Sequence, residues 1–317
     1  MYFANVEIDE IDLEDKKYQI SKHSEYEQLE QSISEFGLIN PVKLIKTEKL
    51  FKVLTGWSRL SVLKKLKFKI VEASVYDEKE LTEEMLYKII YLDNKHRGND
   101  LYKAELINRI RENCGLENEQ IVNNLLPFFG LNPSTNNYNK YIKIALLDSD
   151  IKQSYNNEHL TFEQLQMLGE INDNGLRADI FRLFLTKYKF NNNETRDLLK
   201  DLFNIKNKEN ISIKMISEAV YNKLDDNSNK NDFRKELKKI CYPALTKVEK
   251  VYSDRIKDLN LSNKIRVVNH PYFESNELEI RIKFKETDEL RDELNDLDKN
   301  IINGNIEKLL GVIKEGK

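Results

Sequence analysis

Apolar residues in the first hundred positions switch between helical and alternating spacing, which predicts a small unit of mixed helices and strands. Leu29, Ile33 and Phe36 recur at helical spacing, and Gly37 can end that helix in the left-handed conformation. Strands and further helices then follow one another. We expect strands at residues 42–45, 51–54 and 71–75, and helices at residues 60–66 and 85–90.

From about residue 100 to 225 the apolar spacing is helical almost throughout. Asp100 is expected to cap a helix that continues to Ile110. Thr161 and Gln164 have the spacing of a capping box, in which each side chain bonds the backbone of the other residue. Other amphipathic helices are predicted near residues 121–125, 136–144, 176–188, 193–204 and 211–224.

The last third of the chain returns to a mixed pattern. Residues 225–232 are polar and predict a linker, and a single long helix is expected from Phe233 to Ile256. Strands at 265–268 and 278–284 precede two closing helices. The predicted fold class is therefore α+β and predominantly helical, with a small α+β N-terminal domain (1–99), an all-helical middle domain (100–225) and a small α+β C-terminal domain (226–317).

Composition narrows the classes of protein that the pattern allows. The formal net charge of −3 argues against a generally basic, histone-like binder of nucleic acid, but it leaves room for a local DNA-binding face. The two cysteines, Cys114 and Cys241, form no Cys-x-x-Cys motif. We find neither a secretory signal nor a stretch of the roughly 20 apolar residues that span a membrane, so we expect a cytoplasmic protein.

Two short polar segments predict a nucleotide pocket. In the first, residues 55–59 (Thr-Gly-Trp-Ser-Arg), an apolar strand turns into a helix. Gly56 lets the backbone approach a phosphate, Ser58 offers a hydroxyl and Arg59 a charged fork. In the second, Asp93 can hold Mg²⁺ or its water, and Asn94 and Arg97 can bind phosphate. Either segment alone also fits an ordinary corner or a solvated helix end.

The order of these segments resembles the ParB chromosome- and plasmid-partition family. The resemblance rests on residues 32–42 (Ser-Ile-x-x-Phe-Gly-Leu-Ile-Asn-Pro-Val), 55–60 (Thr-Gly-Trp-Ser-Arg-Leu) and 93–101 (Asp-Asn-x-x-Arg-x-x-x-Leu). In that family the middle motif commonly reads Gly-Glu-Arg-Arg and the later one Glu-Asn-x-x-Arg. The family also shares its N-terminal fold with sulfiredoxin, whose chemistry needs a cysteine in the turn that residues 55–59 occupy; none is present.

The resemblance implies a CTP-binding, Mg²⁺-dependent clamp. Gly56, Ser58 and Arg59 would contact the phosphates, Asp93 would be the metal-associated carboxylate, and Asn94 and Arg97 would line the triphosphate. Gln19 would occupy the position implicated in CTP hydrolysis, which leaves a weak hydrolase activity open. Trp57 and Ser58 replace an acid and an Arg of the family motif, so the phosphate site lacks one cation.

The helices near 121–125 and 136–144 are similar to a helix-turn-helix, which in this family reads a palindromic DNA site. Asparagine can read adenine edges, Ser and Thr can contact bases or phosphates, and Lys neutralises phosphate. The candidate DNA-contacting residues are Ser134, Thr135, Asn136, Asn137, Asn139, Lys140 and Lys143. Tyr138 and Tyr141 have core spacing rather than that of base-stacking platforms. A polar helix in an Asn-rich chain is the alternative.

Together these features predict a ParB-like DNA-binding protein, associated with a nucleoid or plasmid, that binds palindromic double-stranded DNA as a homodimer and closes with CTP and Mg²⁺. The C-terminal strands and helices loosely resemble the family's dimerisation domain. A partition ATPase partner is doubtful, because the family's basic N-terminal tail has acidic residues in its place. The alternatives are a transcription or replication regulator with a vestigial pocket and a small-molecule kinase. The four scattered histidines give no support for a nuclease.

Overall fold

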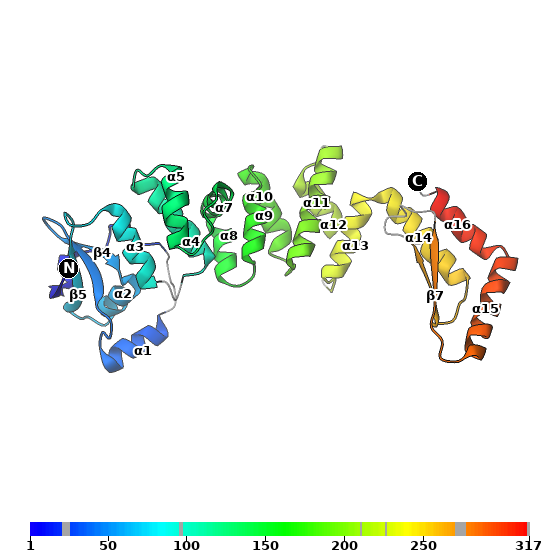
Figure 1. Cartoon of the computed structure of the whole chain (residues 1–317), viewed down its shortest axis with the longest axis horizontal. Helices are drawn as coiled ribbons and strands as arrows, with labels where there is room; N and C mark the ends of the chain where they lie inside the picture. Colours follow the sequence, from blue (N-terminus) through cyan, green and yellow to red (C-terminus); the bar gives the residue numbers. More distant parts are fainter. Residues whose placement is uncertain (21–25, 95–97, 210, 226, 270–276, 316–317) are drawn as a thin grey trace. The chain divides into compact units, whose positions relative to one another are not determined.

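The computed structural model describes residues 1–20, 26–94, 98–209, 211–225, 227–269 and 277–315. By their internal contacts these residues divide into two compact units, Met1–Ala178 and Asp179–Lys317 (Figure 1). The predicted fold class is confirmed, because helices dominate and the strands form two small sheets. The three domains expected at 1–99, 100–225 and 226–317 stay a prediction.

A five-stranded mixed sheet forms the N-terminal part of the first unit. The strand order is β1-β5-β3-β4-β2, with β1 antiparallel to β5, β5 parallel to β3, β3 antiparallel to β4, and β4 parallel to β2. The three predicted strands are present, and two at the N-terminus were missed. The strands are β1 (Tyr2–Glu7), β2 (Ile11–Asp12), β3 (Val42–Lys46), β4 (Phe51–Thr55) and β5 (Ile70–Asp77).

The sheet packs against helices that its own loops supply. Val42, Leu44 and Val53 of the central strands share one buried core with Ile33 of α1 (Glu27–Phe36) and Leu60 of α2 (Trp57–Lys65). Helix α3 (Glu83–Asn94) packs against β4. The helix ends at Gly37 as predicted, and the N–H of Gly37 bonds the carbonyl of Ile33. The expected left-handed conformation is not found, because φ is 73° but ψ is −162°, which is extended. This arrangement brings the ends of β4 and α3 close together.

The rest of the first unit is helical, as predicted. The capping box of Thr161 and Gln164 is confirmed, but Asn99 rather than Asp100 caps α4: its side chain accepts a hydrogen bond from the N–H of Tyr102. An amide oxygen one residue earlier therefore takes the capping role. The elements are α4 (Asp100–Asn113), α5 (Asn118–Gln120), η2 (Ile121–Leu125), α6 (Leu126–Phe128), α7 (Thr135–Ala145), α8 (Ser149–Asn156), α9 (Phe162–Gly169) and α10 (Asn174–Ile180).

Helices also dominate the second unit, and one expectation there was wrong. The single long helix expected from Phe233 to Ile256 is broken at Tyr242, whose φ of −136° and ψ of 62° are not helical. Pro243 follows, and a proline disfavours the helical conformation of the residue before it. The elements are η3 (Phe181–Leu185), α11 (Asn192–Glu209), α12 (Ile213–Tyr221), α13 (Lys230–Cys241), α14 (Pro243–Asp258), α15 (Thr287–Ile302) and α16 (Asn305–Glu315).

The predicted linker at 225–232 is shorter than expected, because α13 already begins at Lys230. Asn229 caps that helix: its side chain accepts hydrogen bonds from the N–H groups of Asn231 and Asp232, and Asp232 bonds back to the N–H of Asn229. An Asn-rich polar stretch therefore reads equally well as a linker or as the start of a capped helix.

The C-terminal strands pair as an antiparallel ribbon of β6 (Ile265–Asn269) and β7 (Leu278–Ile282). Tyr252 of α14 and Leu309 of α16 form a buried cluster against which Val267 and Leu278 of the ribbon pack. Large apolar side chains nevertheless stay exposed around it, among them Ile280, Phe284 and Leu294. This surface is relevant to the predicted dimerisation.

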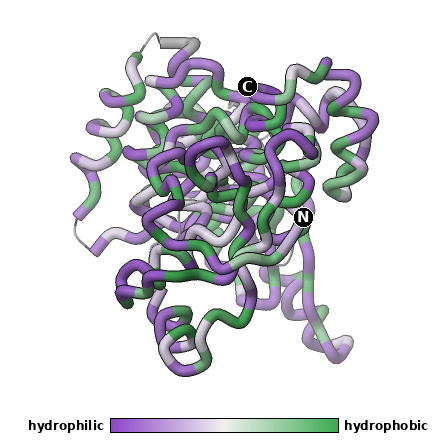
Figure 2. Tube along the Cα trace, turned by 90° about the vertical axis from the view of Figure 1, so that its left-hand side faces the viewer, coloured by the Kyte–Doolittle hydropathy of each residue, from purple (hydrophilic) through white to green (hydrophobic). Residues whose placement is uncertain are grey.

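Hydrophobic stretches in the described chain are short and interrupted by hydrophilic residues (Figure 2). Among the residues that the structure describes, no helix has the length and apolar character needed to cross a membrane.

Candidate functional site

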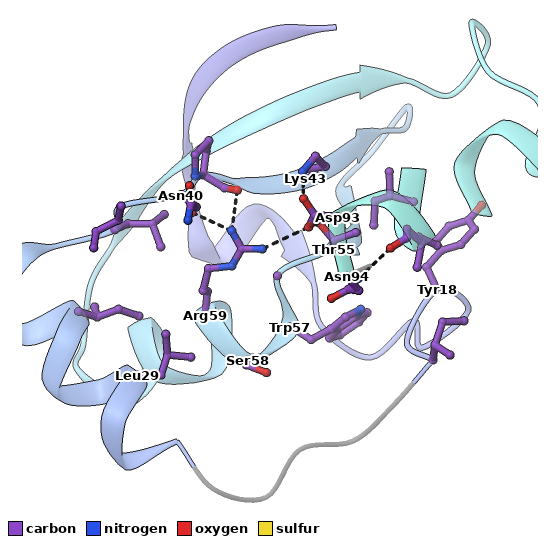
Figure 3. Close-up of a pocket in the computed structure, with 18 of the residues that line it drawn as sticks. Tyr18, Leu29, Asn40, Lys43, Thr55, Trp57, Ser58, Arg59, Asp93 and Asn94 are labelled. Atoms are coloured by element: carbon purple, nitrogen blue, oxygen red, sulfur yellow. Dashed lines mark hydrogen bonds and ion pairs between the residues drawn. The ribbon is translucent and has the colours of Figure 1, made fainter. Parts of the chain in front are cut away.

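A cavity of about 590 Å³ opens in the first unit beside the end of β4. It is lined by the start of α2, the end of α3, the segment before β3, and parts of α1 and α4. Figure 3 shows Arg59, Asp93, Asn94 and Trp57 converging on this space. Segments about forty residues apart in the sequence thus contribute to one site.

Gly56 forms the tight turn between β4 and α2. Its φ of 99° and ψ of 20° are left-handed, and a Cβ atom placed there would lie 2.8 Å from Cγ1 of Val42. Only glycine fits both the conformation and the space. No side chain caps the first turn of α2, so its backbone N–H groups, together with Ser58, stand at the wall of the cavity. Helix starts of this kind favour anions.

Arg59 holds two walls of the cavity together. Its Nη1 donates to the carbonyl oxygens of Asn40 and Pro41, at 2.8 and 2.9 Å, and its Nη2 lies 3.4 Å from Oδ2 of Asp93. The guanidinium is therefore already bonded to protein groups at the position where a phosphate contact was predicted.

Asp93 accepts bonds from three side chains. Lys43 donates to Oδ1, while Thr55 Oγ1, at 2.6 Å, and Arg59 donate to Oδ2. Burial by itself raises the pKa of Asp93, but the hydrogen bonds from Lys43 and Thr55 and the charges of Lys43 and Arg59 outweigh it, so the pKa lies below its usual value. The carboxylate is therefore ionised at neutral pH.

Aromatic and amide side chains complete the cavity. Asn94 turns its Nδ2 to the carbonyl oxygen of Ile90, at 2.9 Å, one turn earlier in α3. Trp57 lines the cavity, and Lys16 Nζ lies 4.5 Å from the centroid of its ring. Within the described chain the buried Nε1–H of Trp57 has no hydrogen-bond partner. Unsatisfied buried donors are uncommon in folded proteins, so an acceptor from a ligand would be stabilising here.

The cavity brings together most of the predicted nucleotide-binding residues. Five of them line it, while Gln19 does not, although its neighbours Tyr18 and Ile20 do; Arg97 lies outside the described residues. The five lining residues are Gly56, Ser58, Arg59, Asp93 and Asn94.

The predicted Mg²⁺ is a poor fit to this arrangement of side chains. Mg²⁺ prefers carboxylate, carbonyl and water oxygens in octahedral geometry. Asp93 is the only carboxylate among the described lining residues, and both of its oxygens accept bonds from Lys43, Thr55 and Arg59. Nor do the described residues contain any cluster of three or more His, Cys, Asp or Glu side chains suited to a metal.

A second candidate site is a pair of helices farther along the first unit. Elements α5, η2 and α6 run consecutively from Asn118 to Phe128, and Gly130, with φ of 73°, ends the run. The N–H of Leu131 bonds the carbonyl of Leu126 and that of Gly130 bonds Pro127, the pairing of a Schellman motif. Ser134 then caps α7 by accepting a hydrogen bond from the N–H of Asn137.

Helix α7 has one buried and one exposed face. Tyr138, Tyr141 and Ile142 are buried, which confirms that the tyrosines pack in the core. Of the predicted DNA-contacting residues, Lys143 pairs with Glu170 at 2.6 Å and Asn137 Nδ2 donates to the carbonyl of Asn132. The remaining five are Ser134, Thr135, Asn136 and Asn139, which are exposed, and Lys140, which is half-buried.

Comparisons with known proteins found similarity only among solved structures. No family model matches the chain, and no curated protein matches it. The C-terminally truncated chromosome-partitioning protein ParB from Caulobacter crescentus, complexed to the centromeric parS site, is 16% identical with a TM-score of 0.37, over 62% of this chain and 98% of that one.

Two further structures carry the same family name. The truncated Caulobacter crescentus ParB complexed with CTP-gamma-S is 16% identical with a TM-score of 0.26, over 57% of this chain and 99% of that one. A pNOB8-like ParB N-domain is 17% identical with a TM-score of 0.39, over 76% and 93%.

Proposed function

We propose that this chain is a ParB-like DNA-binding protein of chromosome or plasmid partition, which binds a palindromic duplex as a homodimer and closes into a clamp when CTP fills the cavity. The observation that carries the proposal is the convergence of Gly56, Ser58, Arg59 and Asn94 on one cavity at a helix start. These groups come from the two segments whose order resembles the family motifs.

The cavity offers phosphate oxygens two kinds of donor. Backbone N–H groups at the start of α2 lack a side-chain cap, and the turn at Gly56 allows a phosphate to approach them. Arg59 provides a charged fork whose present acceptors include two main-chain carbonyl oxygens. A bound triphosphate could displace these carbonyls and thereby change how the segment before β3 is held. Hydrolysis is not part of the proposal, because Gln19 does not line the cavity.

Clamp closure follows from CTP only if the closed state contacts the nucleotide better than the open state does. The segment before β3 is a suitable element for such selection, because Arg59 ties Asn40 and Pro41 to Asp93 at the end of α3. If a bound phosphate changed the hydrogen bonds of Arg59, the contents of the cavity would affect the positions of the segment before β3 and of the end of α3.

DNA recognition is assigned to the exposed face of α7. Thr135, Asn136 and Asn139 are exposed near the start of this helix, where residues of a recognition helix contact base edges. Lys143 can exchange its exposed ion pair with Glu170 for a phosphate at little cost, because surface pairs contribute roughly 0–1 kcal/mol.

The dimer is assigned to the apolar surface around β7, since palindromic sites are read by two-fold symmetric proteins.

Selection of duplexes from a random double-stranded library by the full-length protein tests the proposed DNA recognition. We expect enrichment of an inverted repeat, bound by two chains in analytical ultracentrifugation. The Ile280→Glu variant should lose the dimer, because Ile280 is an exposed apolar residue of β7. Lys283→Glu places a carboxylate at an exposed position just after the end of β7, outside the apolar surface, and should keep the dimer. Enrichment of no sequence would contradict the proposal.

A sequence-specific transcription or replication regulator with a vestigial pocket is the second candidate. It is favoured by one observation: Arg59 and Asp93 bond to each other, and Arg59 also bonds the carbonyl oxygens of Asn40 and Pro41, so protein groups already satisfy part of the site. Such a regulator would still enrich an inverted repeat, but it would not bind CTP in the presence of that DNA.

A further inference from the structure

Lys43 is a charged residue of the cavity that no sequence motif predicted. Its side chain lines the cavity and donates a hydrogen bond to Oδ1 of Asp93. The exposed fraction of the side chain is 24% for Lys43, 17% for Asp93 and 20% for Arg59. Figure 3 shows Lys43 and Arg59 on either side of the Asp93 carboxylate. Three partly buried charges therefore meet at one point of the cavity wall.

The fold places Lys43 there through an irregularity in the sheet. The register between β3 and β4 shifts between Lys43 and Leu44, so that Lys43 lies opposite Thr55 while Leu44 lies opposite Val53. Side chains that face each other across an antiparallel pair lie on the same side of the sheet. Lys43 and Thr55 consequently both bond Asp93, whereas Val42 and Leu44 lie in the core formed with α1 and α2.

The charges of the cavity suit a polyphosphate better than a divalent metal. Among the described lining residues two cations, Lys43 and Arg59, face one carboxylate, which leaves a single positive charge. Asp93 is not available as a metal ligand while Lys43, Thr55 and Arg59 bond it. A lysine ammonium has three donors and is a compact charge, so Lys43 can keep its bond to Asp93 and also reach a phosphate oxygen.

We infer that Lys43 is a second phosphate-binding cation of this site beside Arg59, and that its bond to the phosphates of a nucleoside triphosphate makes the binding independent of a divalent metal. The inference rests on the proposed function of the cavity as a triphosphate site. Asp93 then orients the Lys43 ammonium instead of holding a metal. Lys43 also makes up for the phosphate-binding cation that is missing at Ser58.

Calorimetric titration of the full-length protein with CTP tests this role, in Mg²⁺ and in EDTA, with and without the selected duplex. Fluorescence of Trp57, the single tryptophan of the chain, gives a second readout from the cavity wall. We expect dissociation constants in EDTA within about threefold of those in Mg²⁺. Hydrogen bonds that involve a charged group are stronger than those between neutral groups. Loss of the Lys43 ammonium in Lys43→Gln should therefore weaken CTP binding in EDTA by about 10-fold to 100-fold.

Magnesium should restore part of the binding of Lys43→Gln, because Asp93 loses its ammonium partner and becomes available to a metal. Lys46→Gln removes the same charge from an exposed position of the same strand and should bind CTP like the wild type. Lys43→Arg keeps the charge and should still bind in EDTA.

The outcomes separate this inference from the proposed function. CTP binding by the wild type only in Mg²⁺, or equal binding by wild type and Lys43→Gln in EDTA, overturns the role of Lys43 and leaves the nucleotide site standing. Absence of CTP binding in both solutions, with the selected duplex present, overturns both. The wild-type comparison needs no substitution, so a folding defect of a variant cannot hide the answer.

Discussion

Replacing Asn136 and Asn139 together with Ala is expected to weaken binding to the selected duplex by about 100-fold or more. Both side chains are exposed on α7 and lie three residues apart, on the same side of the helix. A good side-chain contact to a base contributes about 1–3 kcal/mol of discrimination, and two such contacts add up to this loss. Fluorescence anisotropy with the selected and a scrambled duplex measures it.

The specific and nonspecific affinities should respond differently. Binding to the scrambled duplex should stay nearly constant, because it depends on neutralised phosphates and not on base contacts. Asn156→Ala, an exposed asparagine at the end of α8 in the same unit, is the matched control and should leave both affinities unchanged. An equal loss for the two duplexes would place base recognition elsewhere on the protein.

Replacing Asp93 with Ala is expected to lower the free energy of unfolding by about 2–4 kcal/mol. The change leaves the half-buried charges of Lys43 and Arg59 without their carboxylate, and breaking a buried pair on one side is strongly destabilising. Urea denaturation at neutral pH measures the difference. Glu72→Ala, which removes an exposed carboxylate from β5, should change the stability little.

The difference in the free energy of unfolding between wild type and Asp93→Ala should become smaller as the pH falls. The pKa of Asp93 in the folded protein lies below its usual value, so its stabilising contribution is present above the unfolded pKa of about 3.9. The contribution is lost as the pH falls through the lower folded pKa. Wild type and Asp93→Ala should therefore converge in stability in strong acid. A gap that stays constant down to the lowest pH at which both fold would show that Asp93 is not ionised and paired.

The regular elements of this chain could be predicted because their apolar spacing is strong. Strands β3, β4 and β5 and helix α1 have clear patterns with a glycine or polar residues at their ends. Strands β1 and β2 were missed, because β1 buries only Val6 fully and β2 is two residues long. They are strands because β5 and β4 lie beside them, which is a tertiary cause that local spacing does not record.

The candidate site was predictable in its motifs and not in its electrostatics. Gly56 and Asp93 stand at a helix start and a helix end that the sequence indicates. Lys43 sits between two core residues of a strand, and its bond to Asp93 depends on the register shift that places it opposite Thr55 and on the packing of α3 against β4. Nor does local sequence show that Arg59 bonds the carbonyl oxygens of Asn40 and Pro41, because these contacts depend on how the sheet and α2 pack.

Calorimetric titration of CTP into the full-length protein, with the selected duplex and with a scrambled duplex of equal length, tests the central claim most directly. If the cavity is a nucleotide site coupled to DNA recognition, CTP should bind, and the selected duplex should tighten its binding by about fivefold or more, as typical coupling between two sites does. Binding of the selected duplex with no detectable CTP binding would contradict the claim and leave a DNA-binding regulator with a vestigial pocket.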